Sequence, residues 1–123
     1  MDKKEKNILW LSEIGIDDVG IVGGKNGSLG EMYNNLVPKG VNTLDGFALT
    51  TNFYWSYLKA NGLDKTLTDI FKTLDPKSVK SIVETGKKCR AEVKNSNFPE
   101  NLEKELYASY AKLAEKYGTD PDV

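Results

Sequence analysis

The residues of this sequence best suited to chemistry form a glycine-rich turn that carries one lysine. Gly23 and Gly24 come directly before Lys25, and a segment of helical character follows. Glycines lack a Cβ atom, so backbone N–H groups beside them can approach an anion, and the first turn of a helix offers N–H groups without partners. Because Lys25 adds a mobile positive charge, the pattern predicts a corner that contacts phosphate groups.

The spacing around this lysine excludes a P-loop. A P-loop has a glycine six residues before its lysine and a serine or threonine directly after it. Val19 and Asn26 occupy those two positions here. From spacing alone, a second interpretation stays open, in which the glycines form a tight turn and the lysine is simply solvated.

Two short strands and a series of helices are expected around this corner. Apolar runs bounded by turn residues predict strands over residues 8–11 and 46–50. Apolar residues repeated every three or four positions predict helices over residues 25–36, 52–60, 63–74, 76–94 and 99–117. We expect Thr51 or Asn52 to cap the second of these helices and Asp75 to cap the fourth. The expected fold class is therefore mainly helical α+β, with three to five helices and short strands.

Size and composition fit one soluble domain. A chain of 123 residues can bury roughly two thirds of its unfolded surface. The only cysteine, Cys89, cannot form an internal disulfide, and we expect it to be a small core residue.

The sequence contains no histidine, which excludes histidine bases and a phosphohistidine relay within this chain. Arg90 is the only arginine, although phosphoryl-transfer sites usually gather several cations. An ATP-using enzyme of this composition is expected to be incomplete.

Charge balance narrows the possible partners. The chain has 17 basic and 18 acidic residues, and neither half is biased, so we expect neither nucleic acid nor an anionic membrane as a partner. No apolar run is long enough to span a membrane, and the charged start lacks the apolar part of a signal peptide. We therefore expect a cytoplasmic protein in which residues 1–123 form a single partial domain and residues 1–7 are disordered.

Other candidate groups have simpler structural interpretations. The aromatic residues at 53, 54, 55 and 57 lack interleaved basic residues, so core packing is favoured over base stacking. Adjacent acids at Asp17 and Asp18 could bind a metal, but we expect solvated turn residues. Glu31 is expected to lie exposed on its helix, and Arg90 to form a surface ion pair.

The segment over residues 8–51 resembles the start of the phosphoenolpyruvate synthase (pyruvate, water dikinase) family. The likeness lies in the order and spacing of five short motifs: Ile8-Leu9-Trp10, Val22-Gly23-Gly24-Lys25-Asn26, Ser28-Leu29-Gly30-Glu31-Met32, Gly40-Val41, and Gly46-Phe47-Ala48 followed by Thr50-Thr51. Pyruvate phosphate dikinases and rifampin phosphotransferases share the Gly-Gly-Lys turn and the Gly-Phe strand. A fragment of one of these relatives is therefore an alternative.

The resemblance implies an ATP-grasp-like nucleotide-binding domain of which this chain is the N-terminal subdomain. Lys25 matches the ATP-contacting lysine of the family, and Gly23, Gly24 and Asn26 lie in the turn beside it. In the family, ATP with Mg²⁺ phosphorylates a histidine of a central domain, which then phosphorylates pyruvate in a C-terminal barrel. Overall, ATP, pyruvate and water give phosphoenolpyruvate, AMP and phosphate. The implied partners are ATP and the rest of such a parent chain.

Two further expectations follow from departures from the family pattern. Family members usually carry Pro-Pro before the Gly-Phe strand, whereas this chain has Leu44-Asp45, so a more flexible lead-in is expected. Family members also continue beyond this length into a strand with an Arg-Ser-Ser run. We therefore expect an N-terminal piece that is inactive alone. A free-standing helical module that binds a partner protein through apolar faces is the alternative without catalysis.

Overall fold

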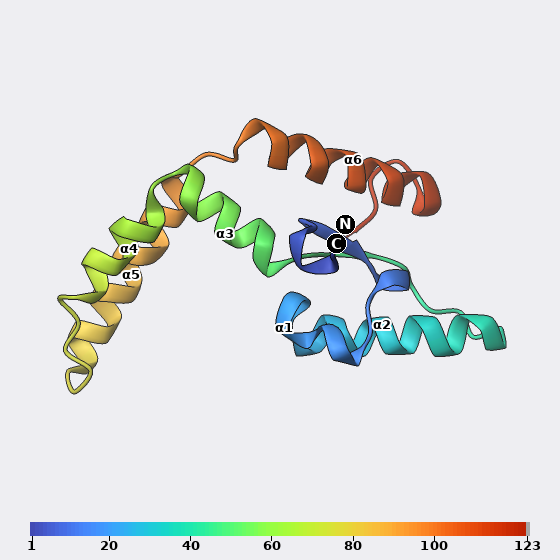
Figure 1. The fold of residues 1–123 in the computed structure, drawn as a ribbon, viewed down its shortest axis with the longest axis horizontal. Coiled ribbons are helices and arrows are strands. Elements are labelled where there is room, and N and C mark those ends of the chain that lie inside the picture. The colour runs from blue at the N-terminus through green and yellow to red at the C-terminus, as the bar shows by residue number, and fades with distance from the viewer. Residues whose placement is uncertain (123) are drawn as a thin grey trace. The chain divides into compact units, whose positions relative to one another are not determined.

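A computed structural model of the chain describes residues 1–122 (Figure 1). Its α-helices and strands are α1 (Val19–Val22), α2 (Gly24–Leu36), α3 (Thr51–Ala60), α4 (Leu63–Phe71), α5 (Val79–Asn95), α6 (Glu100–Tyr117), β1 (Ile8–Trp10) and β2 (Phe47–Leu49). Four short 3₁₀ helices complete them: η1 (Lys3–Glu5), η2 (Leu11–Glu13), η3 (Ile16–Asp18) and η4 (Val37–Lys39). The mainly helical α+β prediction is confirmed. The helix beyond the five that the sequence predicts is α1, a single turn too short to give a periodic signal.

The chain divides into two compact units, each described by itself. One unit contains residues 1–54 and the chain from Glu100 onward, and the other contains residues 55–99. The prediction that the whole sequence is one partial domain stays a prediction. None of the helices in residues 1–122 has the length and hydropathy that crossing a membrane requires.

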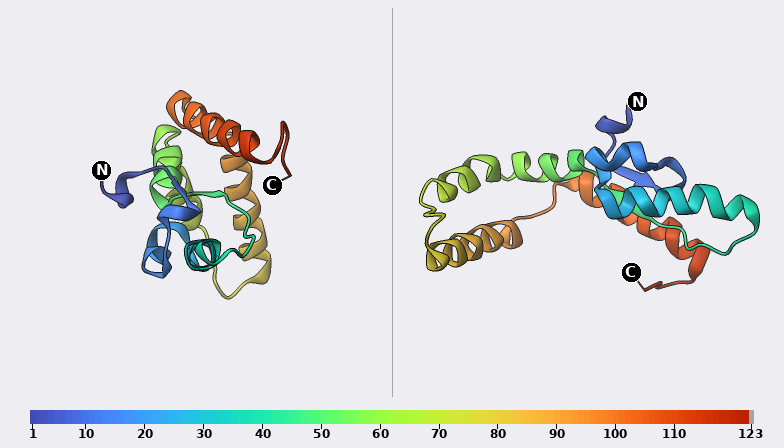
Figure 2. Two further views of the ribbon diagram at one scale, coloured as in Figure 1. Left: turned by 90° about the vertical axis from the view of Figure 1, so that its right-hand side faces the viewer. Right: turned by 90° about the horizontal axis from the view of Figure 1, so that it is seen from below.

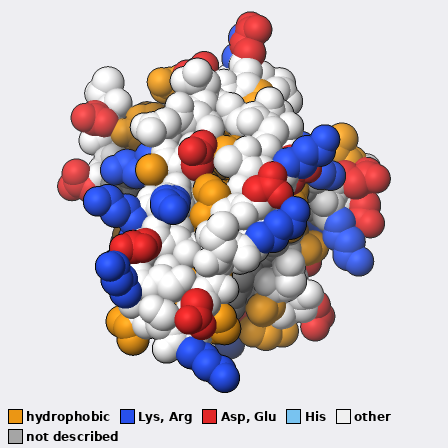
Figure 3. All heavy atoms as spheres, turned by 90° about the vertical axis from the view of Figure 1, so that its left-hand side faces the viewer, with side chains coloured by type: hydrophobic (Ala, Val, Ile, Leu, Met, Phe, Trp, Pro, Cys, Tyr) orange, Lys and Arg blue, Asp and Glu red, His pale blue; other side chains and the backbone are white. Residues whose placement is uncertain are grey.

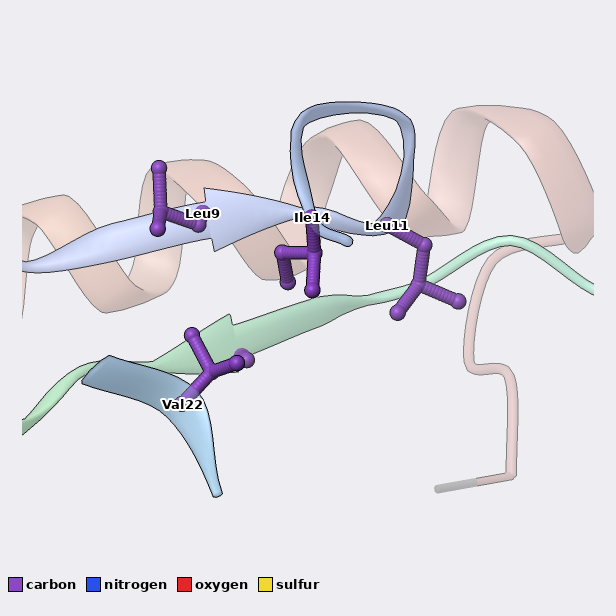
Figure 4. Packing of buried hydrophobic residues seen from close by; sticks show 5 residues of the cluster. Leu9, Leu11, Ile14 and Val22 are labelled. Carbon is purple, nitrogen blue, oxygen red and sulfur yellow. The ribbon is translucent and has the colours of Figure 1, made fainter. Parts of the chain in front are cut away.

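The core of the first unit forms around a small antiparallel sheet. Strands β1 and β2 pair in a register that places Leu9 opposite Ala48. Both side chains are buried, and they join Leu11, Ile14 and Val22 in one apolar cluster. Figure 4 shows these side chains gathered beside the two strands. Because Val22 ends α1, this cluster fixes the end of the chain segment that leads into the Gly-Gly-Lys turn.

The second unit contains a helical hairpin. Helices α4 and α5 pack side by side, as both views of Figure 2 show. The hydroxyl of Tyr57 donates to the backbone oxygens of Val93 at 2.7 Å and Ser96 at 3.1 Å, and its ring packs against Phe98. These contacts tie the end of α5 to α3. The predicted stop after the second long helix is confirmed, because Gly62 takes a left-handed conformation at φ +66°.

The cap of α3 lies one residue before the predicted ones. The hydroxyl of Thr50 accepts a hydrogen bond from the N–H of Phe53 at 3.2 Å and donates to the carbonyl of Lys6 at 2.6 Å. The sequence prediction of Thr51 or Asn52 was wrong because all three residues are chemically able to cap. Pairing with the N-terminal segment selects Thr50.

The cap of α5 also differs from the prediction. Ser78 accepts a hydrogen bond from the N–H of Ser81 at 3.2 Å, so α5 starts at Val79 rather than after Asp75. The carboxylate of Asp75 instead accepts from the N–H of Lys77 at 3.0 Å and stabilises the turn before the helix. The Asp-Pro signal therefore marks a turn here.

The N-terminal segment makes several polar contacts in the structure. The Lys3 ammonium lies 2.8 Å from a carboxylate oxygen of Asp18, and the Lys6 ammonium lies 2.7 Å from a carboxylate oxygen of Glu13. Burial acts to raise the pKa of Glu13, but hydrogen bonds from Lys6 and the N–H of Trp10 outweigh it and lower that pKa. The expectation that residues 1–7 are disordered stays a prediction.

Candidate phosphate-binding corner

The Gly-Gly-Lys turn forms a sharp corner between α1 and α2. Gly23 has φ +83°, a conformation that side chains with a Cβ rarely adopt. Its N–H donates to the carbonyl of Val19 at 2.8 Å, and its own carbonyl accepts from the N–H of Gly27 at 3.0 Å. The chain thus closes one helix and opens the next at a single residue, and Lys25 lies exposed on the first turn of α2.

The four residues of the predicted site lie together, but they present different groups. A Cβ atom on Gly23 or Gly24 would meet nothing within 4 Å, so there is open space beside both. Within residues 1–122, the Lys25 ammonium forms no ion pair or side-chain hydrogen bond. Asn26 instead uses its amide to donate to the carbonyl of Val22 at 2.9 Å. The backbone and Lys25 are available to a ligand, while the Asn26 side chain closes the corner.

Small and polar residues hold helix α2 in place, in addition to Leu29 and Tyr33, which pack against the apolar cluster. A Cβ on Gly30 would lie 2.7 Å from the carbonyl carbon of Ile14, so only glycine permits this approach. Asn34 donates to the carbonyl oxygens of Ile14 at 2.9 Å and Leu11 at 3.1 Å. These contacts fix α2 against the segment that leads into α1.

Two carboxylates that sequence reasoning treated as solvated contribute to the corner. Asp18 is buried and accepts from the N–H of Gly15 at 2.9 Å and from the Lys3 ammonium at 2.8 Å. The Lys3 hydrogen bond, followed by that of the Gly15 N–H, lowers the pKa of Asp18. Glu31 accepts from the N–H of Ile16 at 2.8 Å. Asp18 could have been found from its three-residue spacing after Gly15, but Glu31 gives no local signal because its partner lies 15 residues away.

The remaining candidates divide between core and surface. Phe53 and Tyr57 are buried, as core packing predicts, whereas Tyr54 and Trp55 are each about half exposed. Cys89 is half-buried. Within the described residues there is no group of three or more histidine, cysteine or acidic side chains that could hold a metal ion.

A second polar cluster surrounds the lead-in to β2. The Lys116 ammonium lies 3.2 Å from the carboxylate of Asp45, and the N–H of Asp45 donates to the hydroxyl of Tyr117 at 2.6 Å. The hydrogen bond to Asp45 raises the pKa of Lys116. Nearby, the Lys112 ammonium lies 5.0 Å from the ring centre of Trp10. The two contacts of Asp45 attach the Leu44-Asp45 segment to the end of α6, and the Lys112 contact attaches α6 to β1.

A comparison of the sequence with known protein families matches residues 19–123 to one family, described as pyruvate phosphate dikinase, AMP/ATP-binding domain. The chain belongs to this family. The match begins at the first residue of α1 and includes the whole corner. The part of this chain that matches the AMP/ATP-binding domain therefore includes the Gly23-Gly24-Lys25-Asn26 turn and the helix that follows it.

Individual relatives of this AMP/ATP-binding domain are phosphoenolpyruvate synthases. The chain is 40% identical to the enzyme of Synechocystis over 116 residues, which is 94% of this chain and 14% of the relative. It is 39% identical to the enzyme of Aquifex aeolicus over 119 residues, 97% of this chain and again 14% of the relative. The corresponding enzyme of Neisseria meningitidis is 37% identical over 117 residues. The chain thus spans about a seventh of the length of these relatives.

Proposed function

We propose that this chain acts as part of the ATP-binding domain of a phosphotransferase of the phosphoenolpyruvate synthase type. The observation that carries the proposal is the exposed Lys25 on the first turn of α2, beside two glycines with open space around them. A triphosphate favours a flexible ammonium together with backbone N–H donors. Membership of an AMP/ATP-binding family supports the same ligand.

The four corner residues would then have distinct roles. The Gly23 and Gly24 backbone lets the phosphates approach, Lys25 supplies positive charge, and Asn26 holds the corner closed. We propose that Mg²⁺ comes with ATP, as it does in phosphoryl-transfer sites generally. One corner supplies only a fraction of the contacts that such a site needs, so ATP binding by the isolated chain should be weak, and the chain alone inactive.

The larger protein is proposed from the relatives. An ATP-grasp-like domain completed by further chain, a phosphohistidine domain and a pyruvate-binding barrel would together convert ATP, pyruvate and water into phosphoenolpyruvate, AMP and phosphate. Such a reaction would operate in the cytoplasm and supply gluconeogenesis. The resemblance to phosphoenolpyruvate synthases favours pyruvate over the acceptors of other dikinases or of rifampin phosphotransferases.

The test is Lys25→Met in the full-length gene product that contains this sequence. Removal of one positioned donor from charge developing in a transition state typically costs about 10²–10³ in rate, so ATP-dependent phosphorylation should fall by about that factor. Lys39→Met is the matched control, because Lys39 is also exposed and ends η4, about 20 Å along the helix from Lys25 at ~1.5 Å per residue. Equal activity of the two variants would refute the role of Lys25.

Exposed apolar side chains on the α4–α5 hairpin favour one alternative, a binding module without catalysis. Phe71, Val79 and Val83 are 56%, 76% and 59% exposed. Figure 3 shows hydrophobic side chains lying among charged ones on one face of the molecule. Sequencing of the gene distinguishes the two functions. A reading frame that continues after Val123 into an Arg-Ser-Ser segment supports the enzyme, and a stop codon there supports the module.

A further inference from the structure

Glu31 joins two segments that flank the corner. Its Oε1 atom accepts from the N–H of Ile16 at 2.8 Å, and Ile16 is the first residue of η3, which continues directly into α1. The first N–H groups of a helical segment have no partner within it, and they favour a negative charge nearby. A carboxylate from α2 therefore caps the segment that precedes the corner. Asn35 donates to the second carboxylate oxygen at 3.0 Å and helps to orient it.

The neighbouring N–H group is held by another carboxylate. Asp18 accepts from Gly15 at 2.9 Å and is itself fixed by Lys3. A Cβ on Gly15 would lie 3.0 Å from Oε1 of Glu31, so the absence of a side chain there lets the α2 carboxylate reach the backbone. Two successive N–H groups are thus held by carboxylates from two different segments. The turn before α1 is fixed both from within and from α2.

We infer that Glu31 is a positioning residue for Lys25. This inference rests on the proposed contact of Lys25 with ATP phosphates. The contact from Glu31 to Ile16 closes a loop of chain that contains α1, Gly23 and the first turn of α2. Lys25 lies inside this closed loop, nine residues after one anchor and six before the other. Loss of the anchor releases Ile16 from α2, while the contacts of Gly30 and Asn34 with Ile14 remain. The start of the loop is then held less firmly, so the ammonium and the nearby N–H groups share a less fixed position.

The first experiment measures the contact itself in the 123-residue chain. Amide hydrogen exchange at Ile16, followed by NMR, should become about tenfold faster or more in Glu31→Ala, since a hydrogen bond to a charged group is lost. Glu31→Gln keeps an oxygen acceptor and should exchange nearly as slowly as the wild type. Glu92→Ala is the control, because its carboxylate is exposed in the last turn of α5 and forms no hydrogen bond or ion pair within the described residues.

The second experiment measures the consequence in the full-length gene product. Glu31→Ala should raise KM for ATP about tenfold and leave KM for the acceptor substrate unchanged, while Glu31→Gln restores the ATP value. Unchanged Ile16 exchange, or an equal loss in both Glu31 variants, would overturn the inference. So would a loss that affects ATP and acceptor alike and follows a lowered melting temperature, because it would reflect a structural role only.

The activity of Lys25→Met distinguishes a failure of this inference from a failure of the proposed function. Full activity of Lys25→Met would refute the phosphate role and with it the assignment of Glu31 to that role, even if Ile16 exchange accelerates as expected. Loss of activity in Lys25→Met with no effect of Glu31→Ala on the ATP KM would retain the proposed function and overturn the positioning role alone.

Discussion

Replacement of Gly30 by alanine should destabilise the first unit, although alanine favours helices. The added Cβ would lie 2.7 Å from both the carbonyl carbon and the Cβ of Ile14, and ordinary contacts start near 3.4 Å. Helix α2 and the backbone of Ile14 would have to separate by roughly 0.7 Å. Such overpacking typically costs about 1–3 kcal/mol and occasionally more. The helix-propensity gain of alanine is about 1 kcal/mol. A backbone contact cannot relax by changing a rotamer, so the overpacking cost should lie at the upper end, about 3 kcal/mol. Subtraction of the propensity gain leaves an expected net loss of about 2 kcal/mol.

The measurement is thermal unfolding of the 123-residue chain. A loss of this size lowers the melting temperature by roughly 10 °C in a protein of this length. Tryptophan fluorescence in a Trp55→Phe background reports the first unit, because Trp10 is then the only tryptophan. Gly20→Ala is the control: its Cβ meets nothing within 4 Å, so it should leave stability unchanged or raise it slightly. The packing argument is refuted if Gly30→Ala has the melting temperature of the wild type, or if Gly20→Ala lowers the melting temperature as much as Gly30→Ala does.

Two further changes test the polar contacts. Because its hydrogen bonds depress the pKa of Asp18 below its usual 3.8, the carboxylate stabilises the fold above that value, and this stabilisation is lost as the pH falls through the lowered pKa. Asp18→Asn should therefore flatten the decline of the unfolding free energy below about pH 4, and an unaltered decline in urea titrations would contradict the assignment. Ser78→Ala should lower stability by about 1 kcal/mol and Asp75→Ala by clearly less, whereas the reverse order would restore Asp75 as the cap of α5.

The ends of most elements could be predicted because their signals are local. Gly62 and Gly118 take positive φ, and they lie two residues and one residue after the ends of α3 and α6. Gly40 also takes positive φ and lies four residues after α2, directly after η4. Caps were predicted less well, since several neighbouring residues can each accept from a helix N–H. Thr50 was selected by its bond to Lys6, a residue 44 positions away, and no local pattern contains that information.

The packing face of α2 shows the limit of hydrophobic periodicity. Leu29, Met32 and Leu36 recur at helical spacing and correctly predict a helix. Met32 is nevertheless 47% exposed, and the two leucines are only partly buried. The fully buried positions are Gly27 and Gly30. A glycine contributes no apolar signal, so close backbone packing through glycine is invisible to a method that counts apolar side chains.

The residues that dock α2 against the rest of the unit and the exposed Lys25 lie on opposite sides of the helix. Asn34 lies nine residues after Lys25, which places it about 180° around the helix at ~100° per residue. Its bonds to Leu11 and Ile14, together with the contact at Gly30, occupy one side and leave Lys25 exposed on the other. A change at Asn34 can therefore affect a ligand only by moving the helix, whereas a change at Lys25 removes the charge and leaves the docking intact. Stability and ATP affinity should respond separately to substitutions on the two sides of α2.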